Sequence, residues 1–294
     1  MSSCEHHLDR WTGPAVILAN EQVAEETWKI TLSAPAFAPR VVPGQFLMLH
    51  LPLKSDPLLG RAFAVYSADA ETGEVTVIYL VVGKMTKLLT QCRKGEELEL
   101  TGPLGNGWNV IEQDVPPQFA TTVMETRIRH YIMVAGGIGH TPFYLFAKEQ
   151  LTRGDSNGEK PKLTLLVGAK TTNRLCCLSD FTALGVEVQV ATEDGSEGKK
   201  GFVTDLIAES VQASGVRIPQ TRVLCCGPTP MLKAAWQTSE KLGLRCWVSL
   251  ESAMSCGLGI CYCCAVQYLD NNGQWDYRRT CTDGPVFDAS RLRF

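Results

Sequence analysis

Four cysteines fall within nine positions near the carboxyl end of the chain, in the segment ESAMSCGLGICYCC at residues 251–264. Three of them, Cys256, Cys261 and Cys264, have the spacing C-x4-C-x2-C, and Cys281 follows further along. This is the ligand spacing of a plant-type 2Fe-2S cluster, which four thiolates hold. A zinc site is the main alternative, but it normally shows two C-x2-C pairs, and only residues 261–264 provide one. We therefore predict a 2Fe-2S cluster with these four ligands.

The other cysteines break this spacing or lie in apolar segments. Cys263 does not fit it, so we assign this residue to packing or to the outer side of the loop. Twelve cysteines without an export signal favour metal or redox chemistry over a disulfide framework. Two adjacent pairs, at 176–177 and 225–226, lie in apolar stretches, where a thiol behaves as a small hydrophobic side chain. That interpretation applies to Cys92, Cys176, Cys177, Cys225 and Cys246.

A glycine-rich turn follows an apolar run in YIMVAGGIGHTPFYLFAKE, and a helical pattern follows the turn. A strand, a glycine turn and a helix N-terminus together can hold a pyrophosphate, because glycines allow close approach and helix amides attract anions. A proline in the first helical turn fits this reading. An ordinary turn is the alternative, and the motif is not the G-x-G-x-x-G form. The predicted phosphate-binding residues are Gly136, Gly137, Gly139, Thr141 and Pro142.

A second turn of the same kind is Cys226-Gly227-Pro228, which also separates an apolar run from a helical pattern. The end of a parallel strand in an open sheet is where ligands bind, so we expect the Cys226 thiol to face a nicotinamide ring. Cys226 and Glu251 are the candidate catalytic residues, with a solvated loop carboxylate as the alternative for Glu251. Lys170 and Arg174 either face a nucleotide 2′-phosphate or are surface charges.

A third candidate site lies earlier, in LLGRAFAVYSAD and YLVVGKMTKLL. Arg61 offers a forked donor for phosphate, and Phe63 can lie against a flat ring. Gly83 and Thr86 fall at a predicted helix start, which again suits an anion.

Folded elements must hold these residues in place, and the chain shows two main patterns: a β-rich first part and an alternating β/α part after it. Residues 8–108 show short apolar or alternating runs with turn signals, which predict a β-barrel or sandwich. Residues 109–129 have weak periodicity and are interpreted as a linker or insertion. Residues 130–245 alternate between strand and helix patterns, which predicts a parallel sheet covered by helices on both faces. Residues 246–294 are rich in glycine and cysteine and are predicted to form a small cluster module.

The composition narrows the class of protein further. A hydrophobic content of 45% and a length of 294 residues predict about two globular domains. The net charge of −3 gives no reason to expect nucleic acid as a partner. No signal-peptide pattern and no run of about 18 apolar residues is present, so we expect no membrane span and a cytoplasmic location.

Taken together, the motifs resemble the ferredoxin–NADP reductase superfamily, and the tail SLESAMSCGLGICYCCAV…RRTCTDGPVF narrows the resemblance. It resembles the iron–sulfur, flavin-containing electron-transfer subunits of type B dihydroorotate dehydrogenase. The resemblance implies FAD on the barrel, NADH on the α/β domain and a 2Fe-2S cluster on the C-terminal module. It also implies flavin-binding roles for Arg61, Ala62, Phe63, Ala64, Ile78, Tyr79, Leu80, Met85 and Thr86.

The sequence departs from that family at several positions. The family usually has proline and serine where this chain has Ala62 and Ala64, and loss of the hydroxyl removes a possible hydrogen bond to the flavin. Met85 stands where a second glycine is common, and His140 is unusual inside the glycine turn.

The resemblance also implies a partner. We expect an FMN-containing dihydroorotate dehydrogenase catalytic subunit, in a heterotetramer, because this chain offers no separate site for dihydroorotate. One alternative is the same electron-transfer module serving a sulfide-, hydrogen- or glutamate-linked oxidoreductase. The other is a zinc-stabilised binding module without catalysis.

Overall fold

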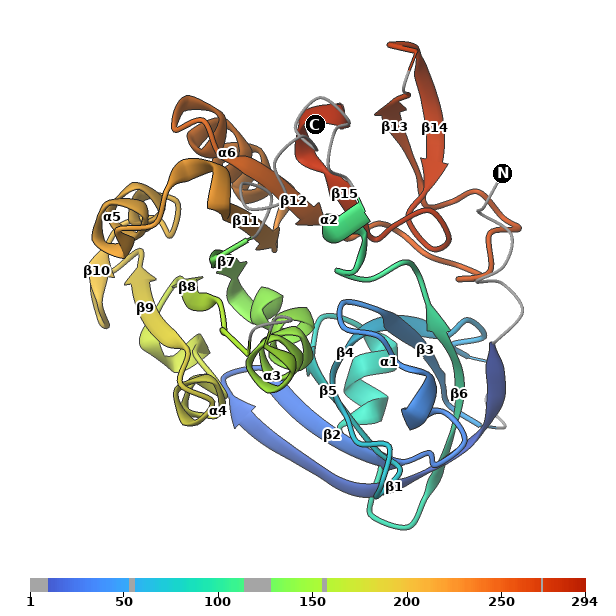
Figure 1. Cartoon of the computed structure of the whole chain (residues 1–294). Helices are drawn as coiled ribbons and strands as arrows, with labels where there is room; N and C mark the ends of the chain where they lie inside the picture. Colours follow the sequence, from blue (N-terminus) through green and yellow to red (C-terminus); the bar gives the residue numbers. More distant parts are fainter. Residues whose placement is uncertain (1–9, 53–55, 114–127, 155–157, 271) are drawn as a thin grey trace.

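The chain folds into a β-barrel, an α/β sheet domain and a small C-terminal module that lies beside both (Figure 1). The structure is a computed structural model, and it describes residues 10–52, 56–113, 128–154, 158–270 and 272–294. The predicted order of a barrel, a parallel-sheet domain and a small C-terminal module is confirmed.

Six antiparallel strands close the barrel in the order β1-β2-β5-β4-β3-β6. Their sequences alternate as a half-buried strand must: in β6, Leu98 and Leu100 point into the core, whereas Glu97 and Glu99 point outward. One short helix, α1 (Lys84–Leu89), follows β5. The strands are β1 (Trp11–Ala24), β2 (Thr27–Ser33), β3 (Phe46–His50), β4 (Arg61–Ala68), β5 (Glu74–Leu80) and β6 (Glu97–Leu104).

The second domain is built on a seven-stranded sheet with the order β10-β9-β8-β7-β11-β12-β15. All neighbours pair in parallel except β12 and β15, which are antiparallel. The strand order reverses at β7, so the crevice for a ligand is expected at the carboxyl ends of β7 and β11. The strands are β7 (His130–Gly136), β8 (Lys162–Ala169), β9 (Glu187–Thr192), β10 (Lys199–Lys200), β11 (Thr221–Cys226), β12 (Arg245–Ser249) and β15 (Val286–Asp288).

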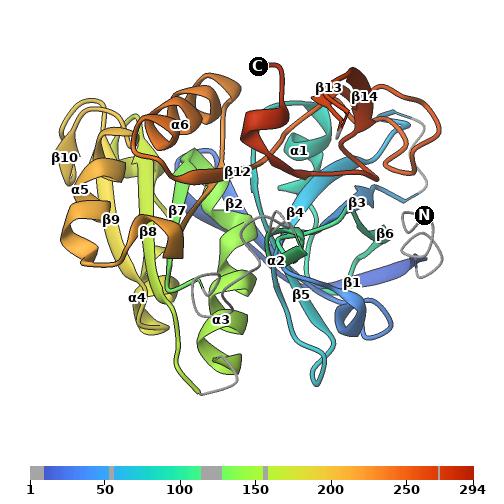
Figure 2. The same cartoon turned by 45° about the horizontal axis from the view of Figure 1, so that its top comes forward.

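Helices cover both faces of this sheet, as the alternating pattern predicts (Figure 2). Phe146 of α3 and Phe181 of α4 belong to the hydrophobic core on one face, and Leu206 of α5 and Leu232 of α6 to the core on the other. The helices are α2 (Val110–Gln113), α3 (Tyr144–Arg153), α4 (Leu178–Ala183), α5 (Asp205–Ser214) and α6 (Thr229–Lys241).

The barrel and the sheet domain share a core. Tyr66 and Ile78 of the barrel pack into the cluster of buried residues that α3 and α4 cover. The Tyr66 hydroxyl donates to Asp180 at 2.7 Å, and its ring stacks on Tyr144 with the centroids 4.5 Å apart. The indole nitrogen of Trp108 donates to the carbonyl of Pro142 at 2.9 Å. The barrel and the sheet domain are therefore held together by buried contacts.

Several elements differ from the sequence-based expectation. Residues 171–184 carry one of the helical patterns of the α/β region, but they form only a 3-10 turn, η5 (Thr172–Arg174), followed by the six residues of α4. The glycine turn leads into a 3-10 helix, η4 (Gly137–Phe143), and the α-helix begins only at Tyr144. The expected linker at 109–129 includes α2, and its residues 114–127 lie outside the described part of the chain.

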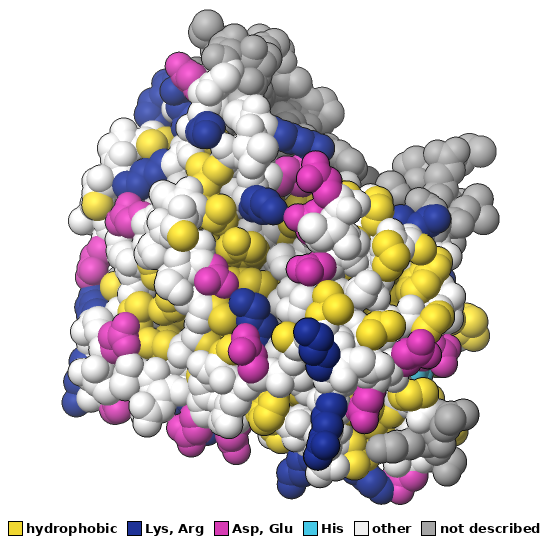
Figure 3. All heavy atoms as spheres, turned by 90° about the horizontal axis from the view of Figure 1, so that it is seen from below, with side chains coloured by type: hydrophobic (Ala, Val, Ile, Leu, Met, Phe, Trp, Pro, Cys, Tyr) yellow, Lys and Arg dark blue, Asp and Glu magenta, His cyan; other side chains and the backbone are white. Residues whose placement is uncertain are grey.

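The C-terminal module is not a separate layer. Its hairpin of β13 (Ala265–Leu269) and β14 (Trp275–Arg279) stands alone as a two-stranded sheet, but β12 and β15 join the large sheet. Among the described residues, no helix is long and apolar enough to cross a membrane. Lys, Arg, Asp and Glu side chains are interspersed over the face in Figure 3, as expected from a net charge near zero.

Candidate functional site

Two cavities meet at the junction of the barrel and the sheet domain. One, of about 370 Å³, lies mainly against the barrel, and the other, of about 580 Å³, lies against the carboxyl ends of the sheet strands. Leu80, Ile138 and Glu251 line both. Two ligands bound in these cavities would therefore come close together beside Glu251.

The barrel-side cavity gathers the residues that the sequence indicated as flavin-binding. The aromatic rings of Phe63 and Tyr79 lie edge to face with centroids 5.9 Å apart, while the Tyr79 hydroxyl donates to Asn20. Both catalytic candidates, Cys226 and Glu251, also line this cavity. The predicted residues in its wall are Arg61, Ala62, Phe63, Ala64, Ile78, Tyr79, Leu80, Gly83, Met85, Thr86 and Thr141.

Two residues of this wall also have structural roles. The Thr86 hydroxyl accepts from the amides of Val82 and Gly83 at 3.0 and 3.1 Å and donates to the Gly83 carbonyl, so it caps helix α1. Met85 is buried in the barrel core. At Gly83, an added Cβ would have no neighbouring atom within 4 Å. This helix start therefore has room for a bound anion.

The glycine turn after β7 packs against the turn after β11. A Cβ on Gly139 would collide with the carbonyl oxygen of Cys226, so only glycine allows the two turns to approach this closely. Gly137 has a positive φ of 57° and open space around its Cα. Gly136, Gly137, Gly227 and Pro228 line the sheet-side cavity. Gly139 and Pro142 do not line either cavity, because they are buried beneath the turn.

Cys226 and Glu251 face the junction with raised pKa values. Burial raises the pKa of the Cys226 thiol, and the nearby Glu251 carboxylate raises it further, so this thiol stays neutral. The Glu251 side chain is exposed, but it opens into the cavities, whose walls raise the pKa of its carboxyl through desolvation.

The sheet-side cavity carries charges of both signs at its outer end. Lys170, Arg174 and Glu193 line it. Arg174 is engaged by the barrel, since its guanidinium lies 2.9 Å from Glu26 and 3.7 Å from Glu25. Glu193 directly follows β9 and was not indicated by the sequence motifs. A carboxylate after a strand of this sheet suits the hydroxyls of a nucleotide ribose.

The four predicted cluster ligands form two pairs. Cys264 and Cys281 are buried, with their sulfurs 3.3 Å apart. The backbone of Cys263, followed by the neighbouring Cys256 thiol, lowers the pKa of the Cys261 thiol. Among the described residues, no three cysteine, histidine or acidic side chains converge to hold one metal ion. Two pairs fit a two-iron cluster, which takes two thiolates on each iron.

The backbone around these thiols supports such a group. The backbone amide of Leu258 donates a hydrogen bond to the Cys256 sulfur at 3.3 Å, as amides around iron–sulfur clusters do. Gly257 has φ +67°, and a Cβ there would meet the Met48 side chain of β3 at 2.9 Å. Glycine therefore lets the loop lie directly on the barrel.

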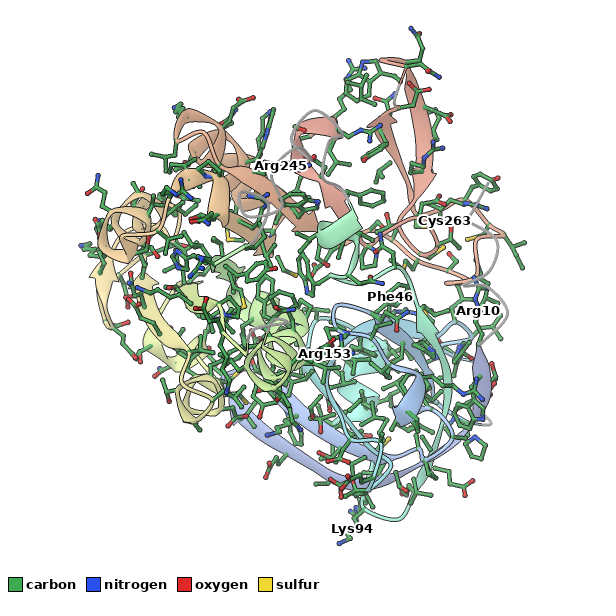
Figure 4. All side chains as sticks on the ribbon, in the orientation of Figure 1. Arg10, Phe46, Lys94, Arg153, Arg245 and Cys263 are labelled. Atoms are coloured by element: carbon green, nitrogen blue, oxygen red, sulfur yellow. The ribbon has the colours of Figure 1, made fainter. Side chains whose placement is uncertain are left out.

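A small apolar cluster joins the thiols to the barrel-side cavity. Phe46, Ala62 and Met254 line that cavity and also pack with Cys264 and Cys281. In Figure 4, Phe46 lies between the barrel and the loop that carries Cys263. Cys263 is exposed, as predicted for a residue on the outer side, and accepts a hydrogen bond from Ser255 at 3.4 Å.

Asn106, which follows β6, ties the segment after Cys281 to the barrel. Its side-chain amide donates to the carbonyls of Asp283 and Val286 at 3.0 and 2.9 Å, and its side-chain oxygen accepts from the Val286 amide at 3.1 Å. Its own backbone amide donates to Gly284 at 2.7 Å. No sequence motif indicated this residue, because its partners lie far away along the chain.

Comparison with known proteins agrees with this division of the molecule. Family models match residues 14–108 as an oxidoreductase FAD-binding domain and residues 133–237 as an oxidoreductase NAD-binding domain. Residues 251–293 match the iron-sulfur cluster binding domain of dihydroorotate dehydrogenase B. The dihydroorotate dehydrogenase B (NAD(+)) electron transfer subunit of Caldanaerobacter subterraneus subsp. tengcongensis is 35% identical, over 97% of this chain and 100% of that protein. The chain belongs to the family of dihydroorotate dehydrogenase B electron transfer subunits.

Two further likenesses support the assignment to this family. The electron transfer subunit of Fusobacterium nucleatum is 33% identical, over 92% of this chain and 94% of that protein. The structure of an NADH-dependent reduced ferredoxin-NADP oxidoreductase, solved in work on flavin-based electron bifurcation, superposes with a TM-score of 0.75. It is 25% identical and covers 95% of this chain and 89% of that one. As an electron transfer subunit, this chain is an NAD-linked oxidoreductase component with FAD, NAD(H) and iron–sulfur sites.

Proposed function

We propose that this subunit moves electrons between NAD(H) and a dihydroorotate dehydrogenase catalytic subunit, by way of FAD in the barrel-side cavity and a 2Fe-2S cluster. One observation carries the proposal. The flavin cavity adjoins the nucleotide cavity at Glu251 and the paired thiols at Phe46, Ala62 and Met254. When bound, the nicotinamide and the flavin would exchange hydride, the cluster would carry single electrons, and the flavin would link the two kinds of transfer.

The residues of the chain position these groups and control their surroundings. Cys226 places a neutral thiol, and Glu251 a carboxyl of raised pKa, where the two ring systems would meet. The neutral Cys226 thiol brings no buried charge against a neutral ring, which would be costly in a dry site. Phe46 and Met254 exclude water between the flavin cavity and the thiols.

We assign the cluster ligands to Cys256, Cys261, Cys264 and Cys281, and this assignment has a direct test. Serine at any of the four should abolish the visible and electron paramagnetic resonance signals of a 2Fe-2S cluster. Cys263→Ser is the matched control, because its sulfur lies on the same loop but outside both pairs, and it should keep the signals. A normal cluster in Cys281→Ser would overturn the assignment.

The partner that we propose is an FMN-containing catalytic subunit, in a cytoplasmic heterotetramer. The names of the relatives support dihydroorotate dehydrogenase as the partner. The exposed Ile260 and Tyr262 flank Cys261 on the cluster loop and offer apolar surface for docking. Anaerobic affinity purification from the source cell, with visible spectra, should recover this subunit with flavin and iron–sulfur bands and with that catalytic chain.

Two results of this purification would count against the proposal. Recovery with a different oxidoreductase and no dihydroorotate dehydrogenase chain would reassign the module to another partner. The likeness to the NADH-dependent ferredoxin-NADP oxidoreductase makes such a partner the second candidate. Protein that carries neither flavin nor iron would refute the electron-transfer role altogether.

We further propose that the nucleotide is NADH and not NADPH. Glu193 would accept from the ribose hydroxyls and repel a 2′-phosphate, and Arg174 is engaged by Glu25 and Glu26. The kcat/KM for NADH should exceed that for NADPH, and Glu193→Ser should narrow the ratio by about tenfold. Glu240→Ser, on the exposed side of α6, serves as the control. An unchanged ratio in Glu193→Ser would refute this role.

A further inference from the structure

The chain contains two pairs of adjacent cysteines, and the structure places them in opposite kinds of geometry. Cys225 and Cys226 are the last two residues of strand β11. Cys176 and Cys177 lie in the turn between η5 and α4. The two thiols of each pair are adjacent in sequence, so any difference in chemistry between the pairs must come from the fold.

The strand pair is held apart by the sheet. Successive side chains of a strand point to opposite faces, and the cores confirm this. Cys225 belongs to the core beneath α5 and α6, whereas Cys226 belongs to the core beneath α3 and α4. Burial raises the pKa of both thiols. Their sulfurs cannot meet without breaking the strand.

The two side chains of the turn pair belong to the same hydrophobic core, the one beneath α3 and α4. Cys177 has left-handed backbone angles, with φ 56° and ψ 19°, which is uncommon for a residue other than glycine. With both side chains on one side of the turn, the two sulfurs can meet, which those of the strand pair cannot.

The surroundings of the two thiols differ. The neighbouring Cys176 thiol lowers the pKa of the Cys177 thiol, burial raises it, and the nearby Lys29 ammonium lowers it again. The neighbouring Cys177 thiol, and then burial, raise the pKa of Cys176. Cys177 is half-buried and Cys176 buried. A lowered pKa with partial exposure is the environment of a reactive cysteine, with a second thiol beside it.

We propose that Cys176 and Cys177 form a redox-active dithiol, which hydrogen peroxide converts to a disulfide between the adjacent residues. The Cys177 thiolate attacks one peroxide oxygen, the O–O bond breaks, and protonation of the leaving oxygen yields water and a sulfenic acid. The Cys176 sulfur then attacks that sulfenic sulfur and expels a second water. Two thiols are thereby oxidised, and one peroxide is reduced to two waters.

The product should be easily reduced. Adjacent Cα atoms lie about 3.8 Å apart, closer than the usual range of about 4.4–6.8 Å for a disulfide, so the ring is strained. Strained disulfides are the labile ones. When FAD is bound in the neighbouring barrel, reaction of the reduced flavin with dioxygen would supply hydrogen peroxide close to this turn.

The cysteine pair lies close to residues of both the sheet domain and the barrel. The Cys176 sulfur lies 3.9 Å from Nε2 of His140, which belongs to the glycine turn. Cys177 precedes helix α4, whose Asp180 accepts the hydrogen bond from Tyr66 of the barrel. Formation of the disulfide would pull Cys176 away from its contact with His140.

Peptide mapping of the intact holoprotein tests the proposal. Trypsin releases residues 175–199, whose only cysteines are 176 and 177, and residues 223–233, whose only cysteines are 225 and 226. After brief exposure to hydrogen peroxide and alkylation, the first peptide should appear unalkylated and two hydrogen atoms lighter, and dithiothreitol should reverse this. Its disulfide fraction should exceed that of the second peptide by about tenfold or more.

The adjacent pair on β11 is the internal control, and equal oxidation of both peptides would overturn the proposal. So would alkylation of both thiols in the first peptide after exposure. A variant gives a second measurement: Cys176→Ser lacks the resolving thiol and should accumulate a sulfenic acid at Cys177 that dimedone labels. Absence of that label in the folded variant would also refute the proposed order of steps. Both measurements read peptide masses, so they stand whatever the subunit's electron-transfer partner is.

Discussion

Replacing Asn106 with alanine should release the segment after Cys281 from the barrel without changing a thiol. The substitution removes three hydrogen bonds, of 2.9, 3.0 and 3.1 Å, between the Asn106 side chain and the backbone of Asp283 and Val286. The backbone bond from Asn106 to Gly284 remains. The barrel, which carries the flavin cavity, and the strand that carries the buried Cys281 would then be joined less firmly.

The expected size of the effect follows from these bonds. Each is worth about 0.5–1.5 kcal/mol, so their loss should lower the free energy of local opening by about 3 kcal/mol. That corresponds to roughly a hundredfold faster exchange of the Val286 amide hydrogen, because this amide donates to Asn106 directly. Hydrogen–deuterium exchange of peptides covering residues 284–288 measures it.

A control and a second readout separate local release from general destabilisation. Asn173→Ala replaces an exposed asparagine of the sheet domain and should leave exchange at 284–288 unchanged. In the holoprotein, Asn106→Ala should broaden the electron paramagnetic resonance signal of the cluster, since Cys281 is less firmly held. If exchange of the Val286 amide rises less than about threefold, the inferred role of Asn106 as a tether is wrong.

Three further outcomes test other parts of the structure. Burial lowers the pKa of His140 to about 4, below its value of about 6.5 in the unfolded chain, so stability should fall between pH 6.5 and 4, by up to about 3 kcal/mol. Urea unfolding at several pH values measures this loss, and a folded His140→Gln variant should show a smaller slope. Tyr66→Phe removes the hydrogen bond to Asp180 and should cost about 1–2 kcal/mol in the same assay, whereas an unchanged midpoint would contradict that value. Gly139→Ala should weaken NADH binding at least about tenfold, because its Cβ would collide with a carbonyl of the β11 turn, while Gly83→Ala, with open space around it, should bind NADH normally.

The parts of the site that the sequence predicted are those set by short stretches of chain. The spacing of Cys256, Cys261 and Cys264 is fixed within one loop, and Cys264 lies 3.3 Å from Cys281, the fourth proposed ligand. The turns at Gly136 and Gly227 also depend on local backbone freedom. Each follows a buried strand, so their meeting at the carboxyl edge of the sheet could be predicted from strand order alone.

The parts that the sequence did not predict depend on distant contacts. Asn106 acts on residues far along the chain, and nothing in its local sequence indicates a tether. Residues 171–184 have helical composition, but Cys177 adopts a left-handed conformation that interrupts the helix. Glu193 resembles any surface carboxylate until the strand before it is placed beside the cavity.

The pairing of β15 with the large sheet limits how parts of this protein can be joined to other proteins. Because β15 pairs with β12, the polypeptide that carries the thiols also supplies the outermost strand of the nucleotide-binding domain. A truncation after residue 250 would therefore uncover the edge of β12, with unpaired backbone groups prone to association. A hybrid reductase that borrows the iron–sulfur unit must also borrow Val286–Asp288 and accept it into its own sheet. The iron–sulfur unit can therefore be transferred to another protein only together with strand β15.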